Sequence, residues 1–163
     1  MKLLTLVRHA KSDWDNDLYD IDRPLSKRGK MDAPMMATIA KNELTKVDVI
    51  FSSPAVRAYS TALEFSQHLN YPLNEIILDK SLYHCGIQEY MDIIEIINQD
   101  INHIYIFSHN PCLTNFVNFL CNENIINIPT CGIAHIELNI HYWTEITRDS
   151  GKLLRFLSPK MFK

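Results

Sequence analysis

Two arginines and two histidines could together bind and attack a phosphoryl group. They are Arg8, His9, Arg57 and His109, and each lies at or soon after the expected end of a short apolar run. The carboxyl ends of strands in an open α/β sheet border the crevice that binds ligands, so these side chains could share one pocket. Two guanidinium groups carry permanent charge, and two helix N-termini would add free N–H groups. We therefore expect a site that binds phosphate, sulfate or a phosphoryl group.

The elements that would position these residues follow an α/β pattern. Short β-branched or aliphatic runs alternate with longer segments of helical period. The expected strands are Leu3–Val7, Val47–Phe51, Glu75–Leu78 and His103–Phe107, and the expected helices are Lys27–Lys41, Ala55–Leu69, Gln88–Asn98 and Leu113–Cys121. This alternation predicts a three-layer α/β/α sandwich around a mostly parallel sheet.

The last part of the chain changes to a different pattern. Two strand-like runs, Ile133–Ile140 and Lys152–Leu157, are joined through a segment that contains Trp143 and Gly151. Neighbouring runs of this kind predict an antiparallel hairpin at one edge. The sheet should therefore be mixed.

Several conspicuous residues are expected to be structural. An apolar stripe at three- and four-residue spacing is typical of a helix that faces a sheet, and it consists of Tyr90, Ile93, Ile94 and Ile97. Four histidines lie in no motif and are interpreted as structural: His68, His103, His135 and His141. The cysteines at positions 85, 112, 121 and 131 form no CxxC pair and have no metal-ligand spacing. We expect them to be buried, reduced thiols, with neither a disulfide nor a zinc site.

Size and composition limit the class of protein. The chain has 163 residues, 47% of them hydrophobic and 21% charged, which suits one globular domain over residues 1–163. Its net charge of -3 provides no basic surface for nucleic acid. The apolar run Met1–Val7 is too short for a signal peptide or a membrane span. We expect a cytoplasmic monomer with neither a nucleic-acid nor a membrane partner.

Four blocks of sequence, in order, resemble the histidine phosphatase superfamily, which has the phosphoglycerate-mutase-like fold. Leu6–Ser12 resembles its Arg-His signature, and Arg23–Gly29 its Arg-Pro-Leu-Ser entry to a helix. Ser52–Ala58 resembles its second arginine block, and His109–Pro111 its second histidine. One Arg-His pair would carry no weight, but four blocks at expected strand exits and helix starts do. The chain is similar over nearly its whole length to the small SixA-type phosphohistidine phosphatases.

The resemblance implies a covalent mechanism without a metal ion or a cofactor. His9 would attack phosphorus and become phosphorylated, and water would then release phosphate. Arg8, Arg57 and His109 would hold the phosphoryl oxygens. Neighbouring arginines would lower the pKa of His9, so that it presents an unprotonated nitrogen.

One carboxylate that many members of the superfamily use as a general acid is missing. Where they carry a glutamate near a Leu-x-Glu turn, this chain reads Leu82-Tyr83-His84-Cys85. An imidazole is a better leaving group than an alkoxide, so phosphohistidine needs an acid less. The difference favours phosphohistidine over phosphate esters. His84 and the more distant Glu89 are candidate proton donors, although His84 could be only a surface residue of the turn.

The segment after the first block departs from the mutase pattern as well. Asp15 stands where mutases carry an asparagine near the phosphate, and a carboxylate there would repel a phosphoryl group. Asp15 therefore either handles a proton or belongs to a solvated acidic loop. Ser12 could donate a hydrogen bond to phosphate, and Asn110 is expected beside it. Arg23 could hold the acidic loop, whereas Arg28 could merely start a helix.

These expectations converge on removal of phosphate from phosphohistidine on a protein of the phosphorelay or phosphotransfer type. A phosphatase for small phosphorylated esters is an alternative within the same fold. A binding module that holds phosphate or phosphohistidine without turnover is a second, which the intact histidines disfavour. A metal-dependent phosphatase that uses the aspartates around Asp13 to Asp22 together with the histidines is a third, but no metal-ligand motif supports it.

Overall fold

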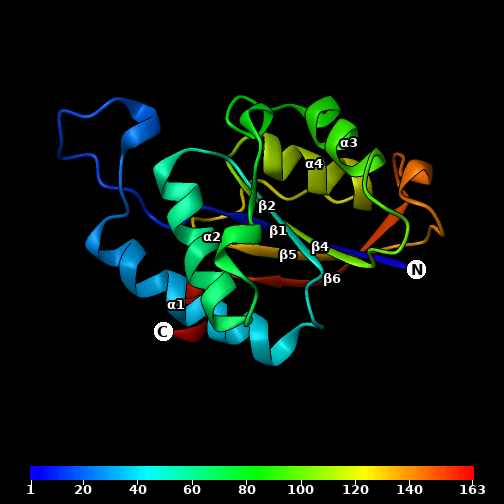
Figure 1. Ribbon diagram of the computed structural model, residues 1–163, viewed down its shortest axis with the longest axis horizontal. Helices are drawn as coiled ribbons and strands as arrows, with labels where there is room; N and C mark the ends of the chain where they lie inside the picture. The colour runs from blue at the N-terminus through cyan, green and yellow to red at the C-terminus, as the bar shows by residue number, and fades with distance from the viewer.

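A six-stranded sheet lies between two layers of helices in the computed structural model, which describes all 163 residues (Figure 1). The strands are β1 Lys2–Arg8, β2 Val49–Ser52, β3 Ile77–Leu78, β4 His103–Ser108, β5 Ile133–Leu138 and β6 Gly151–Leu157. The helices are α1 Lys27–Glu43, α2 Val56–His68, α3 Ile87–Glu95 and α4 Cys112–Cys121. The predicted α/β sandwich is confirmed.

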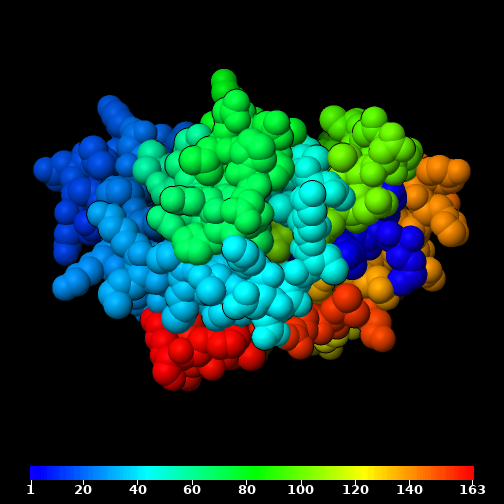
Figure 2. Space-filling view, turned by 60° about the horizontal axis from the view of Figure 1, so that its bottom comes forward, coloured from blue at the N-terminus to red at the C-terminus, as the bar shows by residue number.

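The strand order places β1 in the interior of the sheet. The order is β3-β2-β4-β1-β5-β6, and β1 to β4 form only parallel pairs with one another. β5 runs antiparallel to both β1 and β6, so the predicted hairpin and the mixed sheet are confirmed. Because β1, β2 and β4 are parallel, their carboxyl ends lie at one edge of the sheet. The loop that leaves β1 projects from this edge and forms one end of the molecule (Figures 1 and 2).

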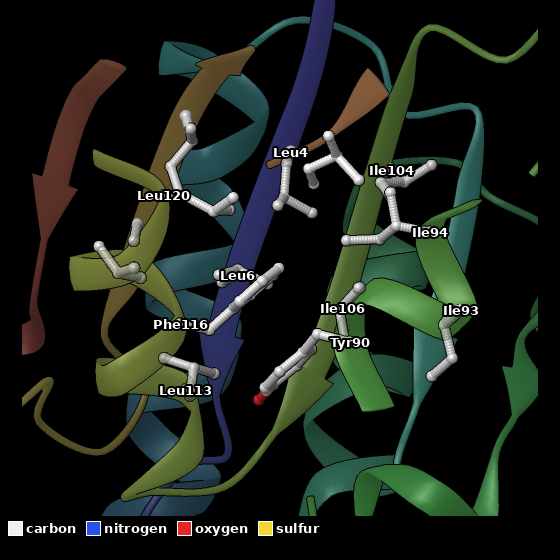
Figure 3. Packing of buried hydrophobic residues seen from close by; sticks show 14 of the residues in the cluster. Leu4, Leu6, Tyr90, Ile93, Ile94, Ile104, Ile106, Leu113, Phe116 and Leu120 are labelled. Atoms are coloured by element: carbon white, nitrogen blue, oxygen red, sulfur yellow. The ribbon is translucent and has the colours of Figure 1, made fainter. Parts of the chain in front are cut away.

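Each face of the sheet is covered by a pair of helices. α1 and α2 bury one hydrophobic cluster, and α3 and α4 bury another on the opposite face. Figure 3 shows α3 and α4 packed over the apolar side chains of β1 and β4. The predicted stripe is buried, although its last member, Ile97, lies just beyond the end of α3. The Tyr90 ring stacks on Phe116 with 4.6 Å between centroids. No helix is both long enough and apolar enough to cross a membrane.

Several expected elements are shorter than the sequence pattern suggests, among them β3 and α3. β3 contains only Ile77 and Leu78, because Pro72 is followed by a 3-10 turn at Leu73–Glu75. α3 begins at Ile87 and ends at Glu95, three residues before the predicted end. At its start, the Glu89 carboxylate accepts the Gly86 N–H at 2.7 Å, which is a helix-capping contact.

The Ser and Gly of the Arg23–Gly29 block attach α1 to the chain just after β1. Ser26 caps the helix by accepting the Gly29 N–H at 3.1 Å. The Ser26 N–H and hydroxyl both donate to the Lys11 carbonyl, at 2.8 and 3.0 Å. A Cβ atom at Gly29 would lie only 2.1 Å from that same carbonyl oxygen. The glycine therefore permits a close approach between α1 and the β1 exit.

We expect Gly29→Ala to lower the free energy of unfolding by about 1 to 3 kcal/mol, the usual cost of overpacking. Alanine normally stabilises a helix relative to glycine, so a loss of stability in Gly29→Ala would itself indicate the close backbone contact. Urea unfolding would measure it, with Gly86→Ala as the matched control. A Cβ there meets first the flexible Glu89 carboxylate, at 3.2 Å. Equal stabilities for the two variants would show that the β1 exit can move away from α1.

The expectation of four reduced cysteines is wrong for Cys85 and Cys112, which form a disulfide. Their Cα atoms lie 5.9 Å apart, within the usual range for a disulfide, although 27 residues separate them in sequence. The contact arises because the turn before α3 packs against the start of α4, and sequence spacing does not encode such packing. Cys121 and Cys131 are free thiols.

Two of the histidines interpreted as structural are buried in the sheet around Thr5. The His103 Nδ1–H donates to the Lys46 carbonyl at 3.1 Å, so a neutral His103 ring accepts the Thr5 hydroxyl at Nε2, at 2.8 Å. The Thr5 oxygen in turn accepts from His135 Nδ1 at 2.8 Å. Burial, and then the neighbouring His135, lower the pKa of His103 to about 4. Burial also lowers the pKa of His135.

We expect stability to fall in acid because of this buried pair. Because folding lowers the pKa of His103, the unfolded chain binds a proton at a higher pH than the folded chain does. The contribution of the neutral ring to the free energy of unfolding is therefore fully present above about pH 6.5 and is lost as the pH falls toward 4. The lowered pKa of His103 alone should reduce the free energy of unfolding by on the order of 3 kcal/mol at pH 4. Urea unfolding at pH 7.5 and 4.5 would measure the loss, and it should persist in His68→Asn, which alters a partly exposed histidine. Equal stability at both pH values would mean that the fold tolerates a protonated pair.

Candidate active site

The three strand exits predicted to meet do form one pocket. It is a cavity of about 380 Å3 at the carboxyl edge of the sheet. Only one of its 11 lining residues is hydrophobic; the lining consists of Arg8, His9, Lys11, Ser12, Trp14, Asp20, Arg23, Arg57, His109, Asn110 and Thr130. Four cationic side chains and one carboxylate make the lining strongly positive, which suits an anion.

His9 is held with one ring nitrogen bonded and the other free to react. Its side chain is buried, and Nδ1 lies 2.7 Å from the Ala10 carbonyl, which can only accept a hydrogen bond, so the proton is on Nδ1. The neutral ring therefore presents an unprotonated Nε2. Burial lowers the pKa of His9 to about 3, with smaller contributions from His109, Arg57 and Arg8. The imidazole is thus a nucleophile rather than a cation at neutral pH.

The backbone beside His9 is fixed by α2. The Thr61 hydroxyl accepts the Ala10 N–H at 3.0 Å and donates to the Arg57 carbonyl at 2.7 Å. This one side chain therefore links the loop that carries His9 to the helix turn that carries Arg57. The Thr-Ala pair at positions 61 and 62 belongs to the same sequence block as Arg57.

The two arginines are oriented by carbonyl and carboxylate groups. Arg8 donates through Nη1 to the Ile128 carbonyl at 2.9 Å. Arg57 donates through Nη1 to the Asp20 carbonyl at 2.7 Å and through Nη2 to its carboxylate at 3.1 Å. The Nε atoms of both arginines are buried without a partner. Each guanidinium therefore has one anchored part and one unused donor.

His109 faces His9 across the pocket, with ring centroids 5.1 Å apart. Its Nε2 lies 2.8 Å from the Ser53 hydroxyl, which already accepts the Ala55 N–H at 3.2 Å. When Ser53 donates to Nε2, the proton of the neutral ring is on Nδ1, which is buried without a partner. Burial first, and then Arg57, lower the pKa of His109 to about 4. The ring is thus a neutral hydrogen-bond donor.

Three residues that line this pocket each have a buried donor without a partner. Five buried side-chain polar atoms in the whole chain lack a partner, and three belong to Arg8, Arg57 and His109. Buried donors are normally satisfied, so a cluster of exceptions indicates a missing acceptor. An oxyanion with several oxygens could supply acceptors to all three.

Ser12 and Asn110 also line the pocket, but their polar groups are already engaged. The Ser12 hydroxyl accepts a hydrogen bond from Arg23. The Asn110 amide donates to Asn127 at 2.8 Å and to the Ile128 carbonyl at 2.9 Å. These contacts brace the pocket walls, and direct binding of phosphate by either residue remains a prediction.

The candidate proton donors lie outside the lining. His84 is exposed, with its ring 4.3 Å from that of Tyr83. Asp15 is exposed in the acidic loop, and its N–H donates to the Asp13 carboxylate at 2.9 Å. Glu89 serves as the cap of α3. No group of three or more His, Cys, Asp or Glu side chains is arranged to hold a metal ion.

Three residues near the pocket gain importance from the structure. Asp20, which the sequence shows only as one aspartate among five, binds Arg23 and Arg57. Arg23 holds the acidic loop, as predicted. The Tyr83 hydroxyl donates to the Asp20 carboxylate from the turn that lacks the glutamate. A weak sequence signal existed for Asp20, since it lies three residues before the Arg-Pro pair.

Comparisons with known proteins agree with this geometry. The model of the histidine phosphatase superfamily (branch 1) matches residues 4–117. The phosphohistidine phosphatase SixA of Escherichia coli is 27% identical over 139 residues, which cover 82% of this chain and 84% of that protein. The solved structure of the protein histidine phosphatase SixA complexed with tungstate is 22% identical, covers 99% of both chains and has a TM-score of 0.84. That structural likeness establishes a shared fold.

One relative with a different name matches a shorter part of the chain. Phosphoserine phosphatase 1 of Hydrogenobacter thermophilus is 44% identical over 75 residues, which are 43% of this chain. The match spans only 34% of that protein. The relatives of this chain are therefore named for different phosphorylated substrates.

Proposed function

The chain belongs to the histidine phosphatase superfamily, and from this membership we propose that it is a metal-independent phosphatase acting on phosphohistidine in a protein. Residues 1–163 would form its single catalytic domain. The observation that carries the proposal is the cluster of unpartnered donors on Arg8, Arg57 and His109 around a neutral His9.

The geometry supports two successive displacements at phosphorus. The free Nε2 of His9 attacks, a bond between Nε2 and phosphorus forms, and the bond from phosphorus to the substrate nitrogen breaks. Water then attacks the phosphorylated His9, which releases phosphate and restores the imidazole. The donors of Arg8, Arg57 and His109 hold the oxygens in both steps, where charge spreads over the transferring group.

The preference for phosphohistidine is supported by the state of Asp20, which is the one carboxylate in the lining. The Tyr83 hydrogen bond, followed by those of Arg23 and Arg57, holds its pKa below the ordinary value. Asp20 is therefore ionised at neutral pH and has no proton to give to an alkoxide. The imidazole of phosphohistidine can take its proton from water, since it leaves more readily.

The test is phosphate release from a phosphohistidine peptide, from phosphoserine and from an aryl phosphate, with and without a chelator. We expect the highest kcat/KM for phosphohistidine, slower release from the aryl phosphate, and the slowest from phosphoserine, whose leaving group is the poorest. The chelator should have no effect. Preferred hydrolysis of phosphoserine would favour an ester phosphatase. Loss of activity on addition of the chelator would favour a metal-dependent enzyme. Binding of phosphate without turnover would favour a binding module.

A further inference from the structure

Asp20 provides acceptors to three side chains that border the pocket. Its carboxylate accepts from Arg23 at 3.0 and 3.2 Å, from Arg57 Nη2 at 3.1 Å and from the Tyr83 hydroxyl. Its carbonyl accepts from Arg57 Nη1 at 2.7 Å. The donors come from three separate parts of the chain: the end of the acidic loop, α2 and the turn before α3. Together they form a built carboxylate site, and this chain fills it with its own side chain.

This carboxylate lies at the pocket wall, not in the core. Half of the Asp20 side chain is exposed, at 51%, and it lines the cavity together with Arg23 and Arg57, which are nearly buried. A molecule in the cavity would therefore lie beside it. The donors around it are the ones that a second anionic group on a small substrate would need.

We propose that Asp20 is a specificity-determining residue, which occupies the carboxylate-binding part of the pocket and so selects substrates that carry no carboxylate near the phosphoryl group. The proposal rests on the proposed function, because it describes the substrate class of the same site. Phosphohistidine within a protein chain carries no free carboxylate, whereas phosphoserine as a free amino acid does.

The shape of a guanidinium explains how Arg57 can serve both groups. Its N–H donors form a planar fork with two usable edges. Asp20 occupies the edge made by Nη1 and Nη2, and the buried, unpartnered Nε lies on the other edge. A substrate carboxylate therefore finds the Nη1–Nη2 edge of Arg57 already taken by Asp20.

Charge acts in the same direction as this occupancy. A substrate carboxylate placed near Asp20 would meet a like charge and would lose the donors that Asp20 holds. Removing the Asp20 carboxylate should leave Arg23, Arg57 and Tyr83 with unpaired donors. An external carboxylate could then bind in its place.

The experiment compares O-phosphoserine with O-phosphoethanolamine, which differ only in the carboxylate. In Asp20→Ala, we expect the ratio of their kcat/KM values to shift toward phosphoserine by about tenfold or more, the effect of one charge-assisted hydrogen bond. Acetate should reverse the shift by filling the vacated position. Asp22→Ala is the matched control, because Asp22 is an exposed aspartate of the same 3-10 turn and should leave the ratio unchanged.

Asp20→Asn keeps the size of the side chain and should shift the ratio in the same direction, by less. An unchanged ratio in correctly folded Asp20→Asn and Asp20→Ala, with no effect of acetate, would overturn the proposal. Should the parent hydrolyse none of the phosphorylated compounds, the proposed function fails, but calorimetry still tests Asp20. The affinity for phosphoserine should then rise relative to that for inorganic phosphate in Asp20→Ala. An equal change in affinity for both ligands would refute the role of Asp20 in specificity.

Discussion

His9→Ala is expected to reduce phosphate release by a factor of about 10⁴ or more, because no other nucleophile in the pocket can form the covalent intermediate. The other imidazole, His109, has its Nε2 bonded to Ser53 and is suited to donate from Nδ1. The variant should still bind inorganic phosphate, since the arginines are unchanged. His9→Asn fills more of the buried space and should be equally inactive.

Rapid quench with a labelled phosphohistidine peptide would show the intermediate directly. The parent should carry label that is stable to base and labile to acid, as a phosphorylated imidazole is, and His9→Ala should carry none. His68→Ala changes a histidine on the surface side of α2 and should match the parent. Turnover in folded His9→Ala comparable to that of the parent would refute the covalent mechanism.

Arg57→Ala is expected to lower kcat/KM by about 10³, the range for loss of a positioned cation in phosphoryl transfer. Arg57 carries a buried donor without a partner and lies against the proposed phosphoryl site. Its loss also leaves the Asp20 carboxylate with one cation fewer. Both changes weaken the binding of transition-state charge.

Arg57→Lys should recover only a small part of the activity, because an ammonium group cannot bond Asp20 through one edge and a phosphoryl oxygen through another. Arg28→Ala is the control: this arginine is exposed on α1, where it pairs with Asp32 within the helix. Steady-state kinetics and phosphate titration would separate kcat from binding. Wild-type kcat/KM in Arg57→Ala would exclude the arginine from the site.

The predictable part of the site consists of residues whose positions follow from the strands. Arg8, His9 and His109 come directly at the ends of β1 and β4, and parallel pairing fixes those ends at one edge. Arg57 follows β2 by one short loop and opens a helix, whose direction is set by packing on the sheet. The strand and helix patterns were therefore sufficient to bring these four side chains together.

The features that the sequence did not reveal depend on contacts between loops. Asp20 and Tyr83 are 63 residues apart, and nothing in the spacing of either residue indicates that one bonds the other. The same holds for Cys85 and Cys112, where packing of the turn before α3 against the start of α4 decides the pairing. The short β3 illustrates a local limit, since a turn after Pro72 overrides the β propensity of the following residues.

The interior position of β1 has a consequence for the order in which this protein acquires activity as it is synthesised. The ribosome makes His9 before the strand partners of β1, because β1 pairs with His103–Ser108 and Ile133–Leu138, which come much later in the chain. Contacts so distant in sequence must wait for the intervening chain. A nascent chain therefore carries its nucleophile before Arg57, His109 and the strand partners of β1 have been made. Catalytic competence arrives only when most of the chain has emerged and the sheet closes around β1.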